Sequence, residues 1–125
     1  MKLIEKSKSV VVVRLSGRLD ATSSRSFQQR LAQVALHPQG VCILDMAGVD
    51  FIDSEGVCAL VQELKRFNDA NCRLAVCNLA PSARLIFEIT QLDQVFEVFA
   101  TLNDLLQVYD VTHEGSETYL ARLSA

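Results

Sequence analysis

The stretch Ile43-Leu44-Asp45-Met46-Ala47-Gly48-Val49-Asp50-Phe51-Ile52-Asp53-Ser54-Glu55-Gly56-Val57 decides the fold of this chain. It begins in an apolar run typical of a buried strand, continues through a short acidic connection, and reaches a serine at the start of an amphipathic helix. The first turn of a helix carries unpaired backbone N–H groups and the positive end of the helix dipole, which favour an anion. Ser54 is therefore the first candidate for a functional residue, because a phosphate could be added to and removed from its hydroxyl.

Strand-like and helix-like segments alternate on both sides of this stretch. Residues 2–6 and 10–15 are two β-type runs that predict an opening hairpin, and the continuous Val10-Val11-Val12-Val13 run predicts a strand covered on both faces. Gly17 and Asp20 are expected to break that strand. Helical spacing follows Ser24, Ser54, Pro81 and Thr101, and apolar runs at 41–44, 73–77 and 95–99 predict further strands.

The resulting order, ββαβαβαβα, has short connections throughout. Strands that alternate with helices predict an α/β fold with a mixed, mostly parallel β-sheet, an N-terminal β-hairpin and about four α-helices. We expect one domain over residues 1–110. Residues 111–125 are expected to form a C-terminal extension that is disordered or contains one short helix.

Composition excludes several classes of protein. The chain has 125 residues, a net charge of −3 and no cluster of Lys or Arg, which argues against a nucleic-acid-binding protein. No apolar run approaches the roughly 20 residues that span a bilayer, and the N-terminus lacks a signal-peptide core, so we expect a cytoplasmic location. The four cysteines, Cys42, Cys58, Cys72 and Cys77, show no metal-ligand spacing, so we expect reduced, mostly buried thiols and neither metal nor cofactor.

In an open α/β sheet, partners and ligands meet the loops at the carboxyl ends of the parallel strands. Three such loops are expected at one edge here, at residues 18–24, 45–55 and 78–82. Asp20 and Ser54 should therefore face the same edge although they are far apart in the sequence. The candidate partner-binding residues are Asp20, Ser23, Ser24, Asp53, Ser54, Glu55, Gly56 and Asn78.

Three of these residues also have a purely structural explanation. Ser54 could be a helix cap worth about 1 kcal/mol, although Ile52 and Val57 could form a hydrophobic staple if Asp53 is the cap. Gly56 could admit the backbone of a partner, or it could allow tight packing of the helix against a strand. Asp20 could simply cap the helix that follows it. The residues alone leave these alternatives open.

An enzyme is not expected. Ser54 lacks the Gly-x-Ser-x-Gly surroundings of a hydrolase nucleophile, and no histidine follows in a place that suggests a triad. Asp53 or Asp45 could be an acceptor aspartate of a response-regulator receiver, but the acidic pair and the late lysine of receivers are missing. The five glycines are scattered singly, so no glycine-rich phosphate loop is present.

Over roughly residues 2–109, the chain resembles the STAS family, which includes the anti-sigma-factor antagonists of bacteria. The resemblance rests on Gly17-x-Leu19-Asp20, on Asp53-Ser54-x-Gly56 and on the helix entry at Pro81. It implies that Ser54 is the phosphoacceptor and that Asp20 lies beside it. One position departs from the pattern: the antagonists usually carry a second small hydroxyl residue after the acceptor, whereas this chain has Glu55. A phosphoserine would then lie between two carboxylates.

The resemblance implies a protein–protein switch. The unphosphorylated chain would bind an anti-sigma factor that is also a serine kinase of the histidine-kinase-like ATPase type, phosphorylation of Ser54 would release it, and a PP2C-type phosphatase would reset it. The alternative is a cytosolic STAS subunit of an ABC-type lipid transporter. There the same edge would be a constitutive docking surface, and Ser54 only a contact or a cap.

Overall fold

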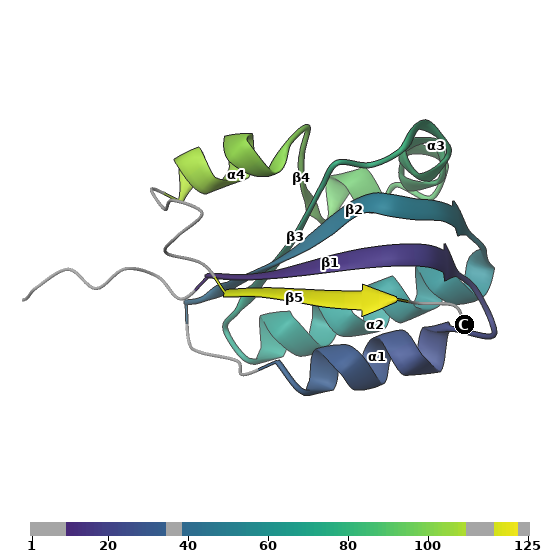
Figure 1. Ribbon diagram of the computed structural model, residues 1–125, viewed down its shortest axis with the longest axis horizontal. Helices are drawn as coiled ribbons and strands as arrows, with labels where there is room; N and C mark the ends of the chain where they lie inside the picture. The colour runs from purple at the N-terminus through teal and green to yellow at the C-terminus, as the bar shows by residue number, and fades with distance from the viewer. Residues whose placement is uncertain (1–9, 35–38, 110–116, 123–125) are drawn as a thin grey trace, which may run out of the picture.

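The computed structural model describes residues 10–34, 39–109 and 117–122 (Figure 1). In chain order the elements are β1 (Val10–Leu19), α1 (Ser24–Ala32), β2 (Val41–Ile52), α2 (Ser54–Asp69), β3 (Arg73–Cys77), α3 (Pro81–Ile89), a 3₁₀ turn η1 (Leu92–Gln94), β4 (Glu97–Phe99), α4 (Leu102–Val108) and β5 (Glu117–Arg122). The five strands form one sheet in the order β4-β3-β2-β1-β5, and every pairing is parallel. The predicted α/β class is confirmed. The predicted strand at residues 2–6, and with it the hairpin, lies outside the described residues.

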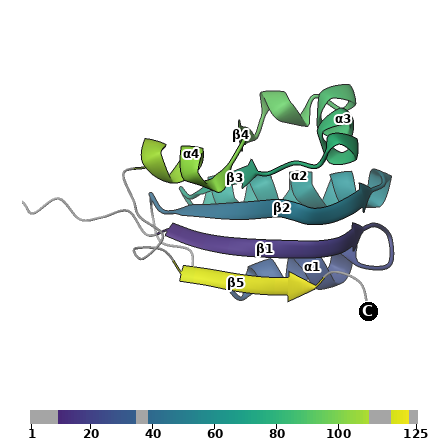
Figure 2. The same ribbon diagram turned by 45° about the horizontal axis from the view of Figure 1, so that its top comes forward.

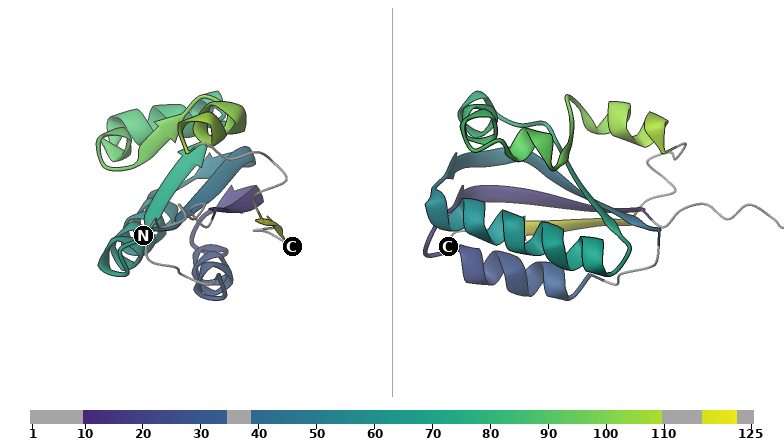
Figure 3. Two further views of the ribbon diagram at one scale, coloured as in Figure 1. Left: turned by 90° about the vertical axis from the view of Figure 1, so that its left-hand side faces the viewer. Right: turned by 180° about the vertical axis from the view of Figure 1, so that it is seen from behind.

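Helices cover both faces of the sheet. Seen from behind, α1 and α2 lie across one face (Figure 3), where Phe27, Leu31, Leu60 and Phe67 are buried against the strands. On the other face, α4 covers the amino-terminal half of the strands with Leu102, Leu105 and Leu106. Val10 to Val13 are all buried between these layers, as predicted for a strand covered on both sides. Within the described part of the chain, no helix has the length and apolar character needed to cross a membrane.

Both strands that lead to Ser54 are longer than the sequence predicts. β1 does not break at Gly17 but continues to Leu19, and the expected acidic connection is the second half of β2. Over the paired stretch β2 inserts an extra residue twice, once between the pairs Arg14↔Asp45 and Ser16↔Gly48 and once after Gly17. Such β-bulges shift the side-chain alternation. The inward side chains of β2 therefore fall at a spacing of three residues, which hides the strand from a search for a period of two.

The C-terminal stretch also differs from the prediction. Glu117–Arg122 forms β5, a parallel strand on the free edge of β1, where the sequence predicts disorder or a short helix. The paired residues run from Val11↔Glu117 to Ser16↔Arg122. An edge strand is specified by the unpaired backbone groups of the strand it joins, which lie a hundred residues earlier in the chain. Local propensity could not reveal that partner.

The predicted helix starts are found where the sequence places them. Pro81 is the first residue of α3, and the Thr101 hydroxyl accepts the Asp104 amide at 3.0 Å to cap α4. The strand predicted at 95–99 is shorter than expected, because η1 precedes it and β4 begins only at Glu97.

Candidate functional site

The ends of β1 and β2 and the starts of α1 and α2 meet at one end of the molecule, on the right in Figure 1. The last paired residues of the two strands are Leu19 and Ile52, and the Asp53 amide donates to the Leu19 carbonyl at 3.2 Å. We call residues 18–24 and 51–56 the rim. The expectation that Asp20 and Ser54 share one edge of the sheet is thus confirmed by the topology.

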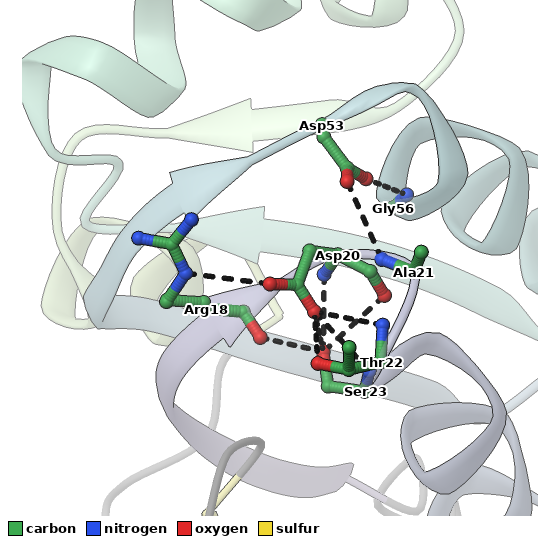
Figure 4. Close-up of polar contacts among 7 residues, drawn as sticks. All are labelled: Arg18, Asp20, Ala21, Thr22, Ser23, Asp53 and Gly56. Atoms are coloured by element: carbon green, nitrogen blue, oxygen red, sulfur yellow. Dashed lines mark hydrogen bonds and ion pairs between the residues drawn. The ribbon is translucent and has the colours of Figure 1, made fainter.

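Asp53 is the residue that organises the rim (Figure 4). Its Oδ1 accepts the Gly56 amide at 3.0 Å, which makes Asp53 the cap of α2. Its Oδ2 accepts the Ala21 amide at 3.3 Å, which ties the start of α2 to the turn before α1. Both carboxylate oxygens therefore have structural partners.

Ser54 occupies the first position of α2, immediately after the cap, and its side chain is exposed. Since Asp53 caps the helix, the explanation of Ser54 as a helix cap does not hold. Among the described residues, the Ser54 hydroxyl makes no hydrogen bond that would occupy it. Glu55 follows it and is also exposed. The rim thus presents a hydroxyl without a structural role, flanked by two carboxylates.

Asp20 holds the turn between β1 and α1. Its Oδ1 accepts the Thr22 hydroxyl at 2.7 Å and the Thr22 amide at 3.0 Å. Its Oδ2 faces the Arg18 guanidinium at 3.3 Å. These donors lower the pKa of Asp20 below its ordinary value, the Thr22 hydroxyl being the largest cause. Asp20 is consequently an ionised residue whose oxygens shape its own turn.

The two serines of this turn differ in their availability to a partner. Ser23 is only 2% exposed, its hydroxyl donates to the Arg18 carbonyl at 2.5 Å, and it accepts the Asp20 amide at 3.0 Å. Ser23 therefore shapes the turn from inside and offers no surface, contrary to its inclusion among the contact residues. Ser24 begins α1 and is partly exposed.

Gly56 is explained by packing within the chain. A Cβ at this position would lie well within 3.0 Å of the Leu19 carbonyl oxygen, and it would lie 3.0 Å from the Ile52 side chain. Of the two explanations that the sequence leaves open, the structure supports close approach of α2 to the ends of β1 and β2.

Asn78 does not join the rim. β3 pairs with β2 only as far as Asp45, and the Asn78 amide group donates to the Asp45 carboxylate at 3.0 Å. The rim begins only at the far end of β2, which is about 20 Å further along the strand at 3.3 Å per residue. Beyond β3, the neighbour of β2 is α3, whose Ser82 hydroxyl lies 3.5 Å from the Asp50 carbonyl.

Two rim residues, Arg18 and Phe51, are not among the candidate residues that the sequence indicates. They are paired in register across β1 and β2, and the Arg18 guanidinium lies 4.1 Å from the centroid of the Phe51 ring. Phe51 is 38% exposed. Its apolar character within the acidic stretch was a signal that this stretch is a strand rather than a connection.

The described residues provide no evident site for a metal ion, since no group of three or more His, Cys, Asp or Glu side chains is arranged to hold one. Cys42, Cys72 and Cys77 are buried, as expected, whereas Cys58 is exposed on α2. Burial raises the pKa of the Cys42 and Cys77 thiols to about 12 each, so neither is a reactive thiolate near neutral pH.

Comparison with known proteins agrees with this architecture. The chain is 24% identical over 99 residues to an anti-sigma F factor antagonist of Paenibacillus polymyxa. The aligned stretch covers 77% of this chain and 83% of that protein. The fold matches the unphosphorylated form of the anti-sigma factor antagonist SpoIIAA with a TM-score of 0.65 and 18% identity, over 90% of this chain and 98% of that one. It also matches a sulfate transporter family protein of Wolinella succinogenes with a TM-score of 0.72 and 17% identity, over 87% and 89% of the two chains. The model of the STAS domain matches residues 1–105, and the chain belongs to the STAS domain family.

Proposed function

We propose that this chain is an anti-sigma-factor antagonist that switches partners through phosphorylation of Ser54. The observation that carries the proposal is the exposed Ser54 hydroxyl at the start of α2, in a helix already capped by Asp53. The similarity to an anti-sigma F factor antagonist supports it. The partner is an anti-sigma factor that is also a serine kinase of the histidine-kinase-like ATPase type, and a PP2C-type phosphatase restores the unphosphorylated form in the cytoplasm.

The geometry gives the switch a physical basis. A phosphate on Ser54 adds a charge of about −1.5 to −2 next to the carboxylates of Asp53 and Glu55. The Gly56 amide, which would otherwise attract an anion to the helix start, already donates to Asp53. The new charge is therefore only partly compensated within the chain. A partner docked on the rim would meet like-charge repulsion and the desolvation of a dianion, and it would dissociate.

In this mechanism the chain is a substrate and a binding protein rather than an enzyme. The ATP belongs to the kinase, and the antagonist contributes only the acceptor hydroxyl and the docking surface. No cofactor is required.

A second candidate is a constitutive docking subunit of a transporter, such as an ABC-type lipid transporter. The similarity of the fold to a sulfate transporter family protein supports this second role. In that role Ser54 remains unmodified and contributes at most a contact.

The two candidates differ in their response to charge at residue 54. Tagged Ser54→Ala and Ser54→Asp variants are used to capture proteins from a lysate of the native host, and the bound proteins are quantified by mass spectrometry. We expect Ser54→Ala to retain a small ATP-binding serine kinase and Ser54→Asp to lose at least about nine-tenths of it, equivalent to about 1.4 kcal/mol.

The matched control is Gln107→Glu, which adds one negative charge on the exposed face of α4, away from the rim. It should capture as much kinase as Ser54→Ala. Equal capture of the kinase by Ser54→Ala and Ser54→Asp would contradict the switch. Capture of a permease–ATPase complex by both variants would establish the transporter role instead.

A further inference from the structure

Among the residues that the structure describes, no helix covers half of one face of the sheet. On the side opposite α1 and α2, α4 covers only the amino-terminal half of the strands, and β1 and β2 continue beyond it toward the rim (Figures 1 and 2). Side chains that alternate with the core positions of β1 emerge there. We call this surface the open half-face; the exposed residues along β1 and β2 that it includes are Arg14, Ser16, Arg18, Gly48 and Phe51.

Arg18 and Phe51 form a fixed unit on the open half-face. The guanidinium lies over the ring at 4.1 Å, and its Nε is held by the Asp20 carboxylate at 3.3 Å. The two terminal nitrogens of Arg18 point away from Asp20 (Figure 4), and within the described residues they have no hydrogen-bond partner. Arg18 is 53% exposed and Phe51 38% exposed. The pair is thus an ordered aromatic surface with unused donors beside it.

The Arg18–Phe51 pair lies close enough to Ser54 to be reached by a protein that binds there. Three peptide units separate Phe51 from Ser54, so their Cα atoms are at most about 11 Å apart. A stable protein–protein complex buries about 800 Å² on each partner, a patch roughly 30 Å across. A protein that holds the Ser54 hydroxyl is therefore large enough to extend around the end of the sheet onto Phe51 and Arg18. Arginine is also among the residue types that most often dominate binding energy, and phenylalanine is enriched at protein–protein interfaces.

We propose that the Arg18–Phe51 pair is the docking anchor for the serine kinase that acts on Ser54, an inference that rests on the proposed function. The kinase supplies an apolar side chain that covers the Phe51 ring and an acceptor oxygen for the terminal nitrogens of Arg18. The pair fixes the kinase on the rim, whereas Ser54 carries the charge that removes it.

The test measures the rate of Ser54 phosphorylation, so the kinase need not be purified. Unphosphorylated protein, well below saturation, is mixed with native-host lysate and ATP, and phosphorylated protein is separated on a phosphate-affinity gel. We expect Arg18→Ala and Phe51→Ala each to lower the initial rate about tenfold or more. Arg18→Ala removes an exposed side chain and keeps the test valid if Phe51→Ala unfolds, which circular dichroism would reveal.

Two matched control variants remove a cation and an apolar side chain at exposed positions outside the rim. Lys65→Ala deletes the cation of another exposed ion pair, with Asp69 at 3.6 Å, and Val108→Ala truncates an exposed apolar residue on α4. Both should be phosphorylated at the wild-type rate. Ser54→Ala should give no signal.

The outcomes separate this inference from the proposed function. If the wild type is phosphorylated at Ser54 but Arg18→Ala and Phe51→Ala match it, the anchor is wrong and the switch stands. A rate that falls only in Leu85→Ala, an exposed position on α3, also overturns the anchor. If the wild type itself is never phosphorylated at Ser54, both the anchor and the switch are wrong.

Discussion

The Asp53 carboxylate and the Ala21 amide are 32 residues apart in the sequence and 3.3 Å apart in space. Through this bond Asp53 holds the turn that leads into α1, and with its other carboxylate oxygen the same side chain caps α2. The two loops of the rim are consequently one unit, joined by this side-chain bond and by the backbone bond from the Asp53 amide to the Leu19 carbonyl.

Replacing Asp53 with asparagine should separate these two tasks. Asparagine caps a helix about as well as aspartate, but its NH₂ group cannot accept the Ala21 amide. We expect Asp53→Asn to lower the free energy of unfolding by about 1 kcal/mol and Asp53→Ala by about 2 kcal/mol, measured by urea unfolding. Hydrogen exchange at the Ala21 amide should accelerate in both variants. Asp50→Asn, at an exposed position of β2, is the control and should leave that amide unchanged.

Gly56→Ala should reverse the usual effect of this substitution in a helix. Alanine normally stabilises a helix by about 1 kcal/mol relative to glycine. Here the added Cβ would collide with the Leu19 carbonyl, and a backbone atom cannot move aside cheaply. We expect a net loss of about 2 kcal/mol or more in the free energy of unfolding. A urea midpoint equal to or above that of the wild type would refute the close packing of α2 on β1.

Thr22→Val should raise the pKa of Asp20 toward its ordinary value, because it removes the hydroxyl that lowers this pKa most. A carboxyl whose pKa is lowered by folding contributes stability above its unfolded pKa, and this contribution is lost as the pH falls through the folded pKa. Thr22→Val should therefore be less stable than the wild type near neutral pH, and the difference should disappear in acid. Carboxyl ¹³C NMR would follow Asp20 directly, and an unchanged titration curve would contradict this assignment.

Tyr109 makes a complementary prediction at high pH. Its hydroxyl donates to Glu97 at 2.5 Å and accepts from Arg73 at 3.1 Å, and burial, followed by the Glu97 hydrogen bond, raises its pKa. A raised pKa means that the stabilising contribution is complete below the unfolded pKa and is lost as the pH rises through the folded one. Compared with Tyr109→Phe, the wild type should lose additional stability as the pH rises above about 10, the ordinary pKa of tyrosine. Parallel urea midpoints for the two proteins over this range would contradict the prediction.

Most of the layer architecture could be predicted because residues that are neighbours in the sequence determine where its helices and strands form. The stripe of Phe27 and Leu31, the apolar run at Arg73–Cys77 and the cap at Thr101 each specify an element from neighbouring residues alone. The position of Ser54 at a helix start followed in the same way. Three of the four cysteines are buried as expected from their apolar surroundings.

The errors have a different physical origin, since most of them depend on a partner strand and one depends on the closure of a turn. The second half of β2 is specified by pairing with β1 through two bulges, and β5 by the free edge of β1. The sequence predicts Asn78 at the rim only if the strands end together, whereas β3 ends beside Asp45. The burial of Ser23 depends on a turn closed by Asp20, which no spacing rule reveals.

The two bulges also mean that the number of residues in β2 determines where and in which direction the strand ends. Between the pairs Arg14↔Asp45 and Arg18↔Phe51, β2 contains two more residues than β1. Deleting one of these extra residues would leave the downstream pairs in register, but it would remove the bend and the added twist of a bulge, and with them the direction in which β2 delivers Asp53 to the start of α2. A grafted or redesigned version of this domain therefore has to conserve the residue count of this strand as strictly as the serine that follows it.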